Sequence, residues 1–177
     1  MKLYVVRHGT TDNNVNKLVN GRNDIDINEQ GIKDAKKAKA ILGDLKFDKI
    51  FCSPLLRAKH TMEIINEGHF PVIYDERLME RDAGVLTSKK ENLIDYDLWY
   101  QINAEPIIGV TESFDDVINR VKSLLKELKN KYKDKTILFV THSGVISALE
   151  VCLFGYPGAS IVKKWVYPNG IVKKYNL

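Results

Sequence analysis

Two arginines and two histidines lie close behind short apolar runs of the chain. Arg7 and His8 directly follow the first run, and His142 directly follows another. Arg57 lies a few residues after a third. Arginine matches two phosphate oxygens at once with parallel N–H groups, and a neutral imidazole can act as a nucleophile or carry a proton. These residue types are typical of a site that binds a phosphate group and acts on it.

The positions of these residues matter because of where parallel sheets bind ligands. Open α/β sheets place their sites at the carboxyl ends of the strands. If the three apolar runs are neighbouring strands, the arginines and histidines meet at one edge, beside the N–H groups of a helix that begins near Ser143. A single histidine in such a place is more often a hydrogen-bonded core residue. Two histidines beside arginines favour an anion site.

Other chemistries lack the sequence patterns that they need. The chain has neither of the glycine-rich motifs that bind nucleotide phosphates, and neither the H-E-x-x-H nor the C-x-x-C pattern of metal sites. Ser143 follows a predicted strand, as a hydrolase nucleophile does, but both glycines of G-x-S-x-G are missing. We therefore expect no metal and no cofactor, and we do not expect Ser143 to be a nucleophile.

Strands and helices alternate along the sequence. This order predicts a single α/β domain over residues 1–177, a three-layer sandwich with a mostly parallel central sheet and helices on both faces. An antiparallel edge strand is expected, as part of a C-terminal hairpin. The most apolar strand, 136–141, is expected in the middle of the sheet. The other strands are expected at 2–6, 48–52, 72–74, 161–167 and 171–175, and helices at 29–42, 54–66, 114–128 and 144–154, with at most one short helix near 91–101.

Cap and turn residues mark the ends of several elements. Asn28, Ser53 and Ser113 are each expected to cap a helix, because their side-chain oxygens can accept from the free N–H groups of a first turn. The segment Pro168-Asn169-Gly170 contains the strongest short signal of a hairpin turn. It predicts that the last two strands pair with each other.

The composition is close to that of an average soluble globular protein. The 177 residues are 44% hydrophobic and 28% charged, which suits one folded domain and excludes disordered and collagen-like chains. Cys52 and Cys152 each lie in an apolar run and are expected to be reduced. The first residues lack the apolar stretch of an export signal. These features predict a cytoplasmic protein.

The basic residues do not form a pattern typical of nucleic-acid binding. The formal net charge is +4, but most of the 27 basic residues are lysines on the surfaces of predicted helices. The apolar stretch 136–156 contains His142, Ser147 and Glu150, so a strand and a helix explain it better than a membrane span does. The expected partner is a small phosphate ester, not a nucleic acid or a membrane. A homodimer through an edge strand or the hairpin stays open.

Five ordered segments along the chain carry recognisable motifs: R-H-G-T-T-D-N-N at 7–14, G-R-N-D and the residues after it at 21–31, S-P-L-L-R-A and Thr61 at 53–61, L-M-E-R-D-A-G at 78–84, and T-H-S-G at 141–144. Together they resemble the motifs of the histidine phosphatase superfamily, the phosphoglycerate-mutase-like proteins, and of its small phosphatases in particular. Asp26 stands where proline is usual in the second of these segments.

The resemblance implies a mechanism for the predicted phosphate site. His8 would attack phosphorus in line and form a phosphohistidine. Arg7, Arg57 and His142 would hold the phosphate oxygens and neutralise the charge of the transition state, without a metal. The backbone carbonyl of Gly9 would hold the other ring nitrogen of His8.

The resemblance also implies roles for residues outside the arginine and histidine group. Glu80 would protonate the leaving alkoxide and then accept a proton from the water that hydrolyses the phosphoenzyme. The residues expected to contact the phosphate or the substrate are Asn14, Arg22, Thr11 and Ser143.

The short segment between Glu80 and Glu112 favours a phosphatase over a mutase. Mutases of the family resembled carry a long insertion there, and a mutase must exclude water while it holds a bisphosphorylated intermediate. The alternatives are a cofactor-dependent phosphoglycerate mutase and a non-catalytic module that binds a phosphorylated ligand. Val85–Ser88 and Thr111 depart from the family pattern within the segment expected to cover the substrate, about 75–112, so the specificity does not carry over.

Overall fold

A five-stranded sheet forms the centre of the computed structural model, which describes residues 1–165 and 167–177. Its strands are Lys2–Arg7 (β1), Lys49–Cys52 (β2), Val72–Tyr74 (β3), Thr136–Thr141 (β4) and Val172–Asn176 (β5). The order is β3-β2-β4-β1-β5, so β4 lies in the middle as expected. All neighbours run parallel except β5, which pairs antiparallel with β1. The predicted sheet with an antiparallel edge strand is confirmed.

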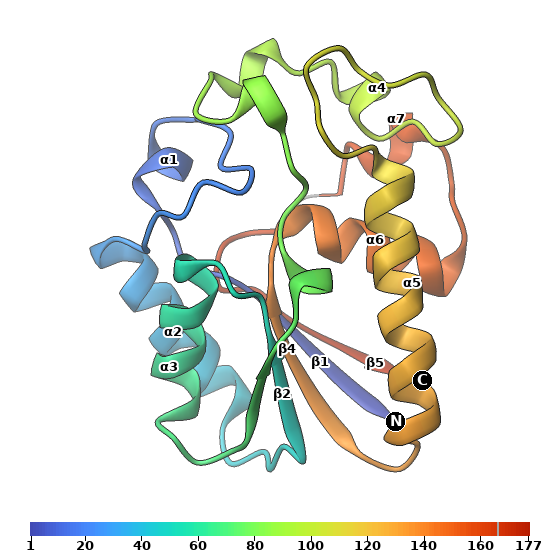
Figure 1. The fold of residues 1–177 in the computed structure, drawn as a ribbon. Helices are drawn as coiled ribbons and strands as arrows, with labels where there is room; N and C mark the ends of the chain where they lie inside the picture. The colour runs from blue at the N-terminus through green and yellow to red at the C-terminus, as the bar shows by residue number, and fades with distance from the viewer. Residues whose placement is uncertain (166) are drawn as a thin grey trace.

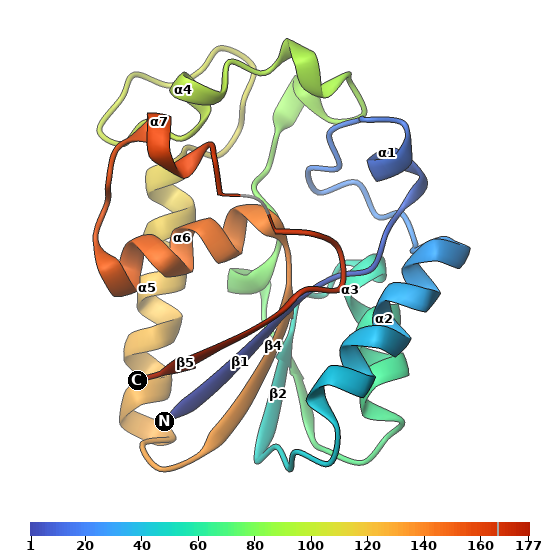
Figure 2. The ribbon, with the colours of Figure 1, turned by 180° about the vertical axis from the view of Figure 1, so that it is seen from behind.

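Helices cover both faces of this sheet (Figure 1). On one face lie α2 (Glu29–Leu42) and α3 (Leu56–Asn66), and on the other lie α5 (Phe114–Lys131) and α6 (Ser143–Phe154). The view from behind shows the same three layers (Figure 2). The predicted α/β sandwich is therefore confirmed.

The two faces of the sheet are filled by alternating side chains of each strand. In β4, Ile137 and Phe139 pack with the α5 and α6 side, whereas Leu138 and Val140 pack with the α2 and α3 side. This follows from the two-residue period of a strand. The apolar stretch 136–156 thus forms a buried strand and a helix, and no helix in the described part of the chain is long and apolar enough to cross a bilayer.

Two of the three predicted helix caps are confirmed. Asn28 accepts from the Gly31 N–H at 3.1 Å at the start of α2, and Ser113 forms a capping box at the start of α5. Ser53 does not cap α3, whose N-cap is Leu55. The Ser53 hydroxyl lies 2.7 Å from His142 Nε2, and it accepts from the N–H of Leu55 itself at 3.3 Å rather than from an N–H within the first turn of α3.

The predicted C-terminal hairpin is wrong in its first strand. Residues 159–162 form a short helix, α7 (Ala159–Val162), followed by a turn, while residue 166 lies outside the described residues. Val162 is buried in the core, and Lys163 pairs with Asp97, so tertiary contacts override the β-branched pattern. The Gly170 N–H donates to the carbonyls of Arg7 and His8, so residues 167–170 pack on the end of β1.

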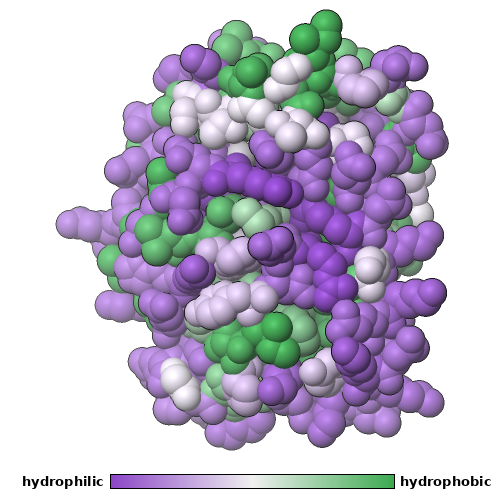
Figure 3. Space-filling model, viewed as in Figure 1, coloured by the Kyte–Doolittle hydropathy of each residue, from purple (hydrophilic) through white to green (hydrophobic). Residues whose placement is uncertain are grey.

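An irregular segment, residues 75–112, lies over the carboxyl ends of the strands and is called the covering segment below (Figure 1). Hydrophobic side chains gather on its outer surface at the top of Figure 3, and Val85, Leu93, Leu98 and Ile108 are each more than half exposed. One short helix near 91–101 was expected, and two are found there. The short helices of the segment are η1 (Glu76–Leu78), η2 (Gly84–Leu86), η3 (Glu91–Leu93) and α4 (Tyr96–Trp99), and the loop after β1 contains α1 (Asp12–Val15).

Candidate active site

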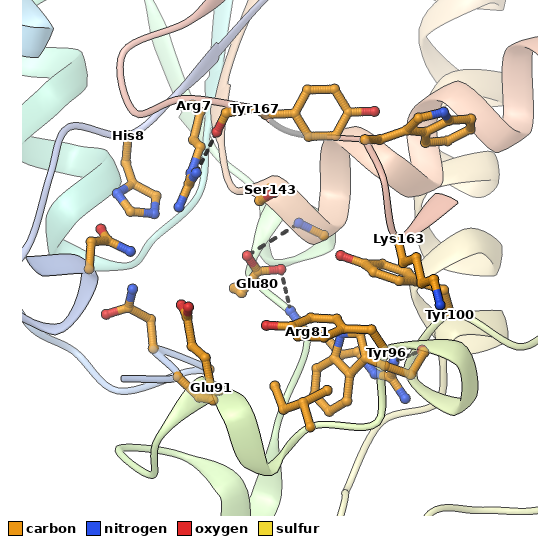
Figure 4. Close-up of a pocket in the computed structure, with 18 residues that line it drawn as sticks. Arg7, His8, Glu80, Arg81, Glu91, Tyr96, Tyr100, Ser143, Lys163 and Tyr167 are labelled. Atoms are coloured by element: carbon orange, nitrogen blue, oxygen red, sulfur yellow. Dashed lines mark hydrogen bonds between the residues drawn. The ribbon is translucent and has the colours of Figure 1, made fainter. Parts of the chain in front are cut away.

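A cavity of about 340 Å³ opens between the end of β1, the start of α6 and the covering segment (Figure 4). Arg7, His8 and Ser143 line its inner end. The acid residue predicted in the covering segment, Glu80, also lines it, and Figure 4 shows this carboxylate between the inner end and the aromatic residues opposite. The sheet edge at which ligands of α/β proteins bind is therefore hollow and lined by polar groups.

His8 is held as a neutral imidazole. Its Nδ1 lies 2.7 Å from the Gly9 carbonyl, which can only accept, so Nδ1 carries the proton and Nε2 keeps its lone pair. Burial, followed by the charges of Arg57 and Arg7, lowers the pKa of His8 well below its ordinary value of 6.5. Gly9 can have no side chain, because a Cβ there would lie 2.3 Å from the Gly31 carbonyl. The geometry leaves an unprotonated nitrogen available as a nucleophile.

Each of the two arginines has one guanidinium N–H group without a hydrogen-bond partner among the described residues. Arg57 is fully buried and donates to the carbonyls of Gly21 and Asn23 at 2.8 and 2.7 Å, and burial lowers its pKa to about 10. Arg7 donates to the Tyr167 carbonyl. The Nε of each arginine is buried without a hydrogen-bond partner among the described residues. Buried donors without partners are costly, and an anion in the cavity would satisfy them.

His142 completes the group of cations and donors. Its ring is fully buried and its centroid lies 5.1 Å from that of His8. Nε2 lies 2.7 Å from the Ser53 hydroxyl, and Nδ1 has no hydrogen-bond partner among the described residues. Burial, and then the charge of Arg57, lowers the pKa of His142 well below 6.5. The structure thus brings Arg57 and His142, which are distant in the sequence, next to the adjacent residues Arg7 and His8.

Glu80 reaches the site from the covering segment. Its Oε1 accepts from the Arg81 N–H at 2.9 Å, and its Oε2 accepts from the Gly144 N–H at 3.3 Å, in the first turn of α6. A Cβ on Gly144 would lie 2.4 Å from Oε1. The glycine after Ser143 is therefore the residue that lets the carboxylate approach the helix start. Glu80 is in place to exchange a proton with a group bound in the cavity.

A second carboxylate, Glu112, holds the Glu80 loop. It accepts from the Asp82 N–H at 2.9 Å and pairs with Arg120 at 2.7 Å and with Arg22 at 3.3 Å. Arg22 also donates to the Glu80 carbonyl. Arg22, expected to contact substrate, therefore lies outside the cavity lining and supports the acid loop in this structure.

The remaining predicted contacts fall into two kinds. Asn14 lines the cavity, and its side-chain oxygen accepts from Thr11 and from Asn169. Thr11 is fully buried, forms the capping box of α1 with Asn14, and does not line the cavity. Ser143 lines the cavity as the first residue of α6. The structure therefore places Asn14 and Ser143 at the site and Thr11 behind it.

A family model described as the histidine phosphatase superfamily (branch 1) matches residues 3–173. The chain belongs to this superfamily. Its named relatives include phosphatases, so a phosphatase-type enzyme is confirmed at the level of the family.

Three of the similar proteins cover most of the chain. The uncharacterized phosphatase PhoE of Bacillus subtilis is 34% identical over 82% of this chain and 73% of its own length. The adenosylcobalamin/alpha-ribazole phosphatase of Salmonella typhimurium is 33% identical over 91% of this chain and 83% of its own. A mycobacterial glucosyl-3-phosphoglycerate phosphatase, solved with VO3, has a TM-score of 0.85 at 28% identity, over 98% of this chain and 90% of that one.

Sequence reasoning missed several residues of this histidine phosphatase site. Tyr167 holds Arg7 with its carbonyl, Asn169 donates to the His8 carbonyl at 2.9 Å, and Ser53 contacts His142. Asn169 was visible as a turn signal, but its contact with His8 depends on where 167–170 packs. Ser53 was assigned to a helix cap. Backbone carbonyls such as that of Tyr167 leave no residue-type signal.

The described residues contain no group of three or more histidine, cysteine, aspartate or glutamate side chains arranged to hold a metal ion. Among the described residues, the cations that line the cavity are Arg7, Arg81 and Lys163, whereas Arg57 and His142 are fully buried and are not part of its lining. A phosphate beside His8 would find donors in Arg7 and in the N–H groups at the start of α6, with the unpaired Arg57 Nε and His142 Nδ1 buried next to this group.

Proposed function

We propose that the protein is a metal-independent phosphomonoesterase that hydrolyses a small phosphorylated metabolite through a phosphohistidine on His8. The observation that supports this most is the neutral, buried His8 imidazole beside Arg7 and Arg57, whose Nε atoms are both buried without a hydrogen-bond partner among the described residues. The nucleophile and the groups that would bind the transferred phosphoryl group are thus assembled at one end of the cavity.

The first step transfers the phosphoryl group to the protein. The lone pair of His8 Nε2 forms a P–N bond while the ester P–O bond breaks in line with it. Glu80, in its acid form, gives its proton to the leaving alkoxide. The hydrogen bond from Nδ1 to the Gly9 carbonyl stabilises the imidazole as it becomes positive.

The second step releases inorganic phosphate. Glu80, now a carboxylate, accepts a proton from water as the water oxygen attacks phosphorus and the P–N bond breaks. Arg7 and Arg57 stabilise the charge on the phosphoryl oxygens in both steps. Two unit charges 4 Å apart interact by about 4 kcal/mol at an effective dielectric constant of about 20, so two guanidinium groups can take the place of a metal ion.

The test compares wild type with His8→Ala on p-nitrophenyl phosphate, with and without a chelator. We expect His8→Ala to lose activity by about 10⁴-fold or more, and the chelator to have no effect. The control is His69→Ala, which removes an exposed histidine outside the cavity. Full activity of His8→Ala would overturn the proposal.

Two further measurements separate the alternatives. A phosphoenzyme that is labile in acid and stable in base is expected with wild type, whereas a non-catalytic binding module would form none. A phosphoglycerate mutase would move phosphate between the hydroxyls of phosphoglycerate, and we expect release of inorganic phosphate instead.

The proposed substrate is a small molecule, with neither nucleic acid nor membrane as a partner. Both cysteines are free thiols, which supports the reducing, cytoplasmic location expected from the sequence. A homodimer stays a prediction that sedimentation of the purified protein would test.

A further inference from the structure

Aromatic and apolar side chains form a wall of the cavity, namely Ile94, Tyr96, Trp99, Tyr100 and Trp165. Figure 4 shows two of them, Tyr96 and Tyr100, across the cavity from His8. With the phosphate at the inner end, the organic part of a substrate must pack on this wall. The volume of about 340 Å³ suits a small metabolite. The charged groups in this outer part then decide which metabolites fit.

The two cations of the outer part are already engaged by the protein. Arg81 donates to the carbonyls of Glu112 and Trp99, and its guanidinium lies 3.9 Å from the centroid of the Trp99 ring. Lys163 pairs with Asp97. Neither cation is free to bind an acidic group of the substrate, because each would first have to give up a partner within the protein.

Glu91 differs from these cations. Its half-buried side chain lines the cavity, and Figure 4 shows it extending toward the space beside His8 and Arg7. Among the described residues, no hydrogen bond or ion pair engages its carboxylate. Burial lowers the pKa of Arg7, and the negative charge of Glu91 partly opposes this effect. Burial raises the pKa of Tyr96, and the charge of Glu91 raises it further. The carboxylate therefore faces the substrate space from between the phosphate end and the aromatic wall.

The backbone of Glu91 is held in place. Its N–H donates to the Lys17 carbonyl at 2.9 Å, and Leu18 and Lys90 form an antiparallel bridge. The Val19 N–H donates to the Lys89 carbonyl at 2.8 Å. This pairing ties η3 to the loop after β1, so Glu91 enters the cavity from a fixed position rather than from a loose loop.

We propose that Glu91 is a specificity-determining residue: it favours phosphate esters whose organic part carries hydroxyl or amine groups and disfavours those with a second acidic group. The inference rests on the proposed function, because it concerns the same cavity. A carboxylate accepts hydrogen bonds from hydroxyl and ammonium groups, whereas it repels a substrate carboxylate in a water-poor space. Specificity here comes from repulsion as well as from attraction.

The test uses two esters of nearly the same size, glycerol 3-phosphate and 3-phosphoglycerate, which differ by a hydroxymethyl against a carboxylate. We expect wild type to prefer glycerol 3-phosphate by about tenfold or more in kcat/KM, and Glu91→Gln to reduce that ratio by about fivefold to tenfold. The matched control is Glu105→Gln, an exposed glutamate of the covering segment that does not line this cavity.

A binding measurement keeps this inference separate from the proposed function. In the His8→Ala background, calorimetry should give the same preference between the two esters, again reduced by Glu91→Gln. A ratio near one in wild type, or a ratio that Glu91→Gln leaves unchanged in either assay, would overturn the role of Glu91. Wild type that binds both esters with the expected preference but hydrolyses neither of them, nor p-nitrophenyl phosphate, would overturn the proposed function and support the role of Glu91.

Discussion

The two ends of the cavity are built in different ways. At the phosphate end, Arg7 is the last residue of β1 and His8 the next, and His142 directly follows β4. Parallel backbone pairing between β1 and β4 brings them together, and both histidine rings are buried. The positions of these side chains are therefore set by the sheet, which is the most regular part of the fold.

The covering segment lies outside the sheet, and its longest helix, α4, has four residues. Backbone hydrogen bonds tie residues 88–91 to the loop after β1, and side chains hold much of the rest: Arg81 binds the carbonyls of Glu112 and Trp99, and Glu112 binds Arg120. In the proposed function, the phosphate group common to every substrate would meet the sheet edge, whereas the part that varies between substrates would meet the covering segment. The first end would then set the reaction, and the second could vary the specificity.

The largest effect is expected at the sheet edge. Arg57→Ala should lower kcat/KM for p-nitrophenyl phosphate by about 10³–10⁵-fold, as for arginines that neutralise phosphoryl-transfer transition states. Arg57→Lys should recover little, because an ammonium cannot keep the Gly21 and Asn23 carbonyls and reach a phosphate as well. Arg77→Ala, outside the cavity, is the control. Equal losses in Arg57→Ala and the control would contradict the assignment.

The acid of the covering segment should matter less, and in a way that depends on the leaving group. Glu80→Gln should lower kcat/KM for an alkyl phosphate by about 10²–10⁴-fold, since an alkoxide must be protonated as it leaves. The loss should be much smaller for p-nitrophenyl phosphate, whose leaving group needs no proton. Steady-state kinetics on both substrates check this. Identical losses on both would show that Glu80 is not the general acid.

Breaking the ion pairs of the covering segment should cost stability. Glu112→Gln leaves Arg120 and Arg22 without their carboxylate, and we expect a loss of about 3 kcal/mol in the free energy of unfolding. Urea unfolding measures it. Glu127→Gln, which removes a surface carboxylate paired with Arg77 and Lys131, should leave the midpoint nearly unchanged. A stable Glu112→Gln protein would mean that the segment is held by its apolar contacts.

The smallest effect is the response of the phosphate end to acid. The pKa values of His8 and His142 lie below 6.5 because of burial and the charge of Arg57. Below pH 6.5 the unfolded chain therefore binds more protons than the folded one. Stability is fully present above pH 6.5 and falls as the pH drops, by at most about 1.4 kcal/mol per pH unit for each histidine. Urea midpoints between pH 7.5 and 5.5 should fall less steeply for His142→Gln, and parallel curves would contradict this.

The contrast between the sheet edge and the covering segment also determines which features could be predicted from the sequence. Strand and helix bounds, the central place of β4, and the meeting of His8 with His142 and Arg57 follow from apolar periodicity and from the rule for parallel sheets. Local patterns are sufficient where the backbone itself sets the position.

The covering segment and the C-terminal turn depend on distant partners. The contact of Arg81 with the Trp99 carbonyl, and the packing of α7 beside α4, leave no periodic pattern in the sequence. The run at 161–162 is β-branched and favours a strand locally, yet Val162 is buried as part of a helix. Propensity is a weak guide where long-range packing is the larger energy.

The contact between Asn169 and His8 also sets when the site can be completed during synthesis. The two residues are 161 positions apart in the sequence. Tyr167, whose carbonyl accepts from Arg7, is also synthesised near the end of the chain. At about 5–20 residues per second, translation takes on the order of ten seconds or more to cover that distance. The nucleophile therefore leaves the ribosome long before the residues that steady it, and a nascent chain that ends before residue 167 should carry His8 without a working site.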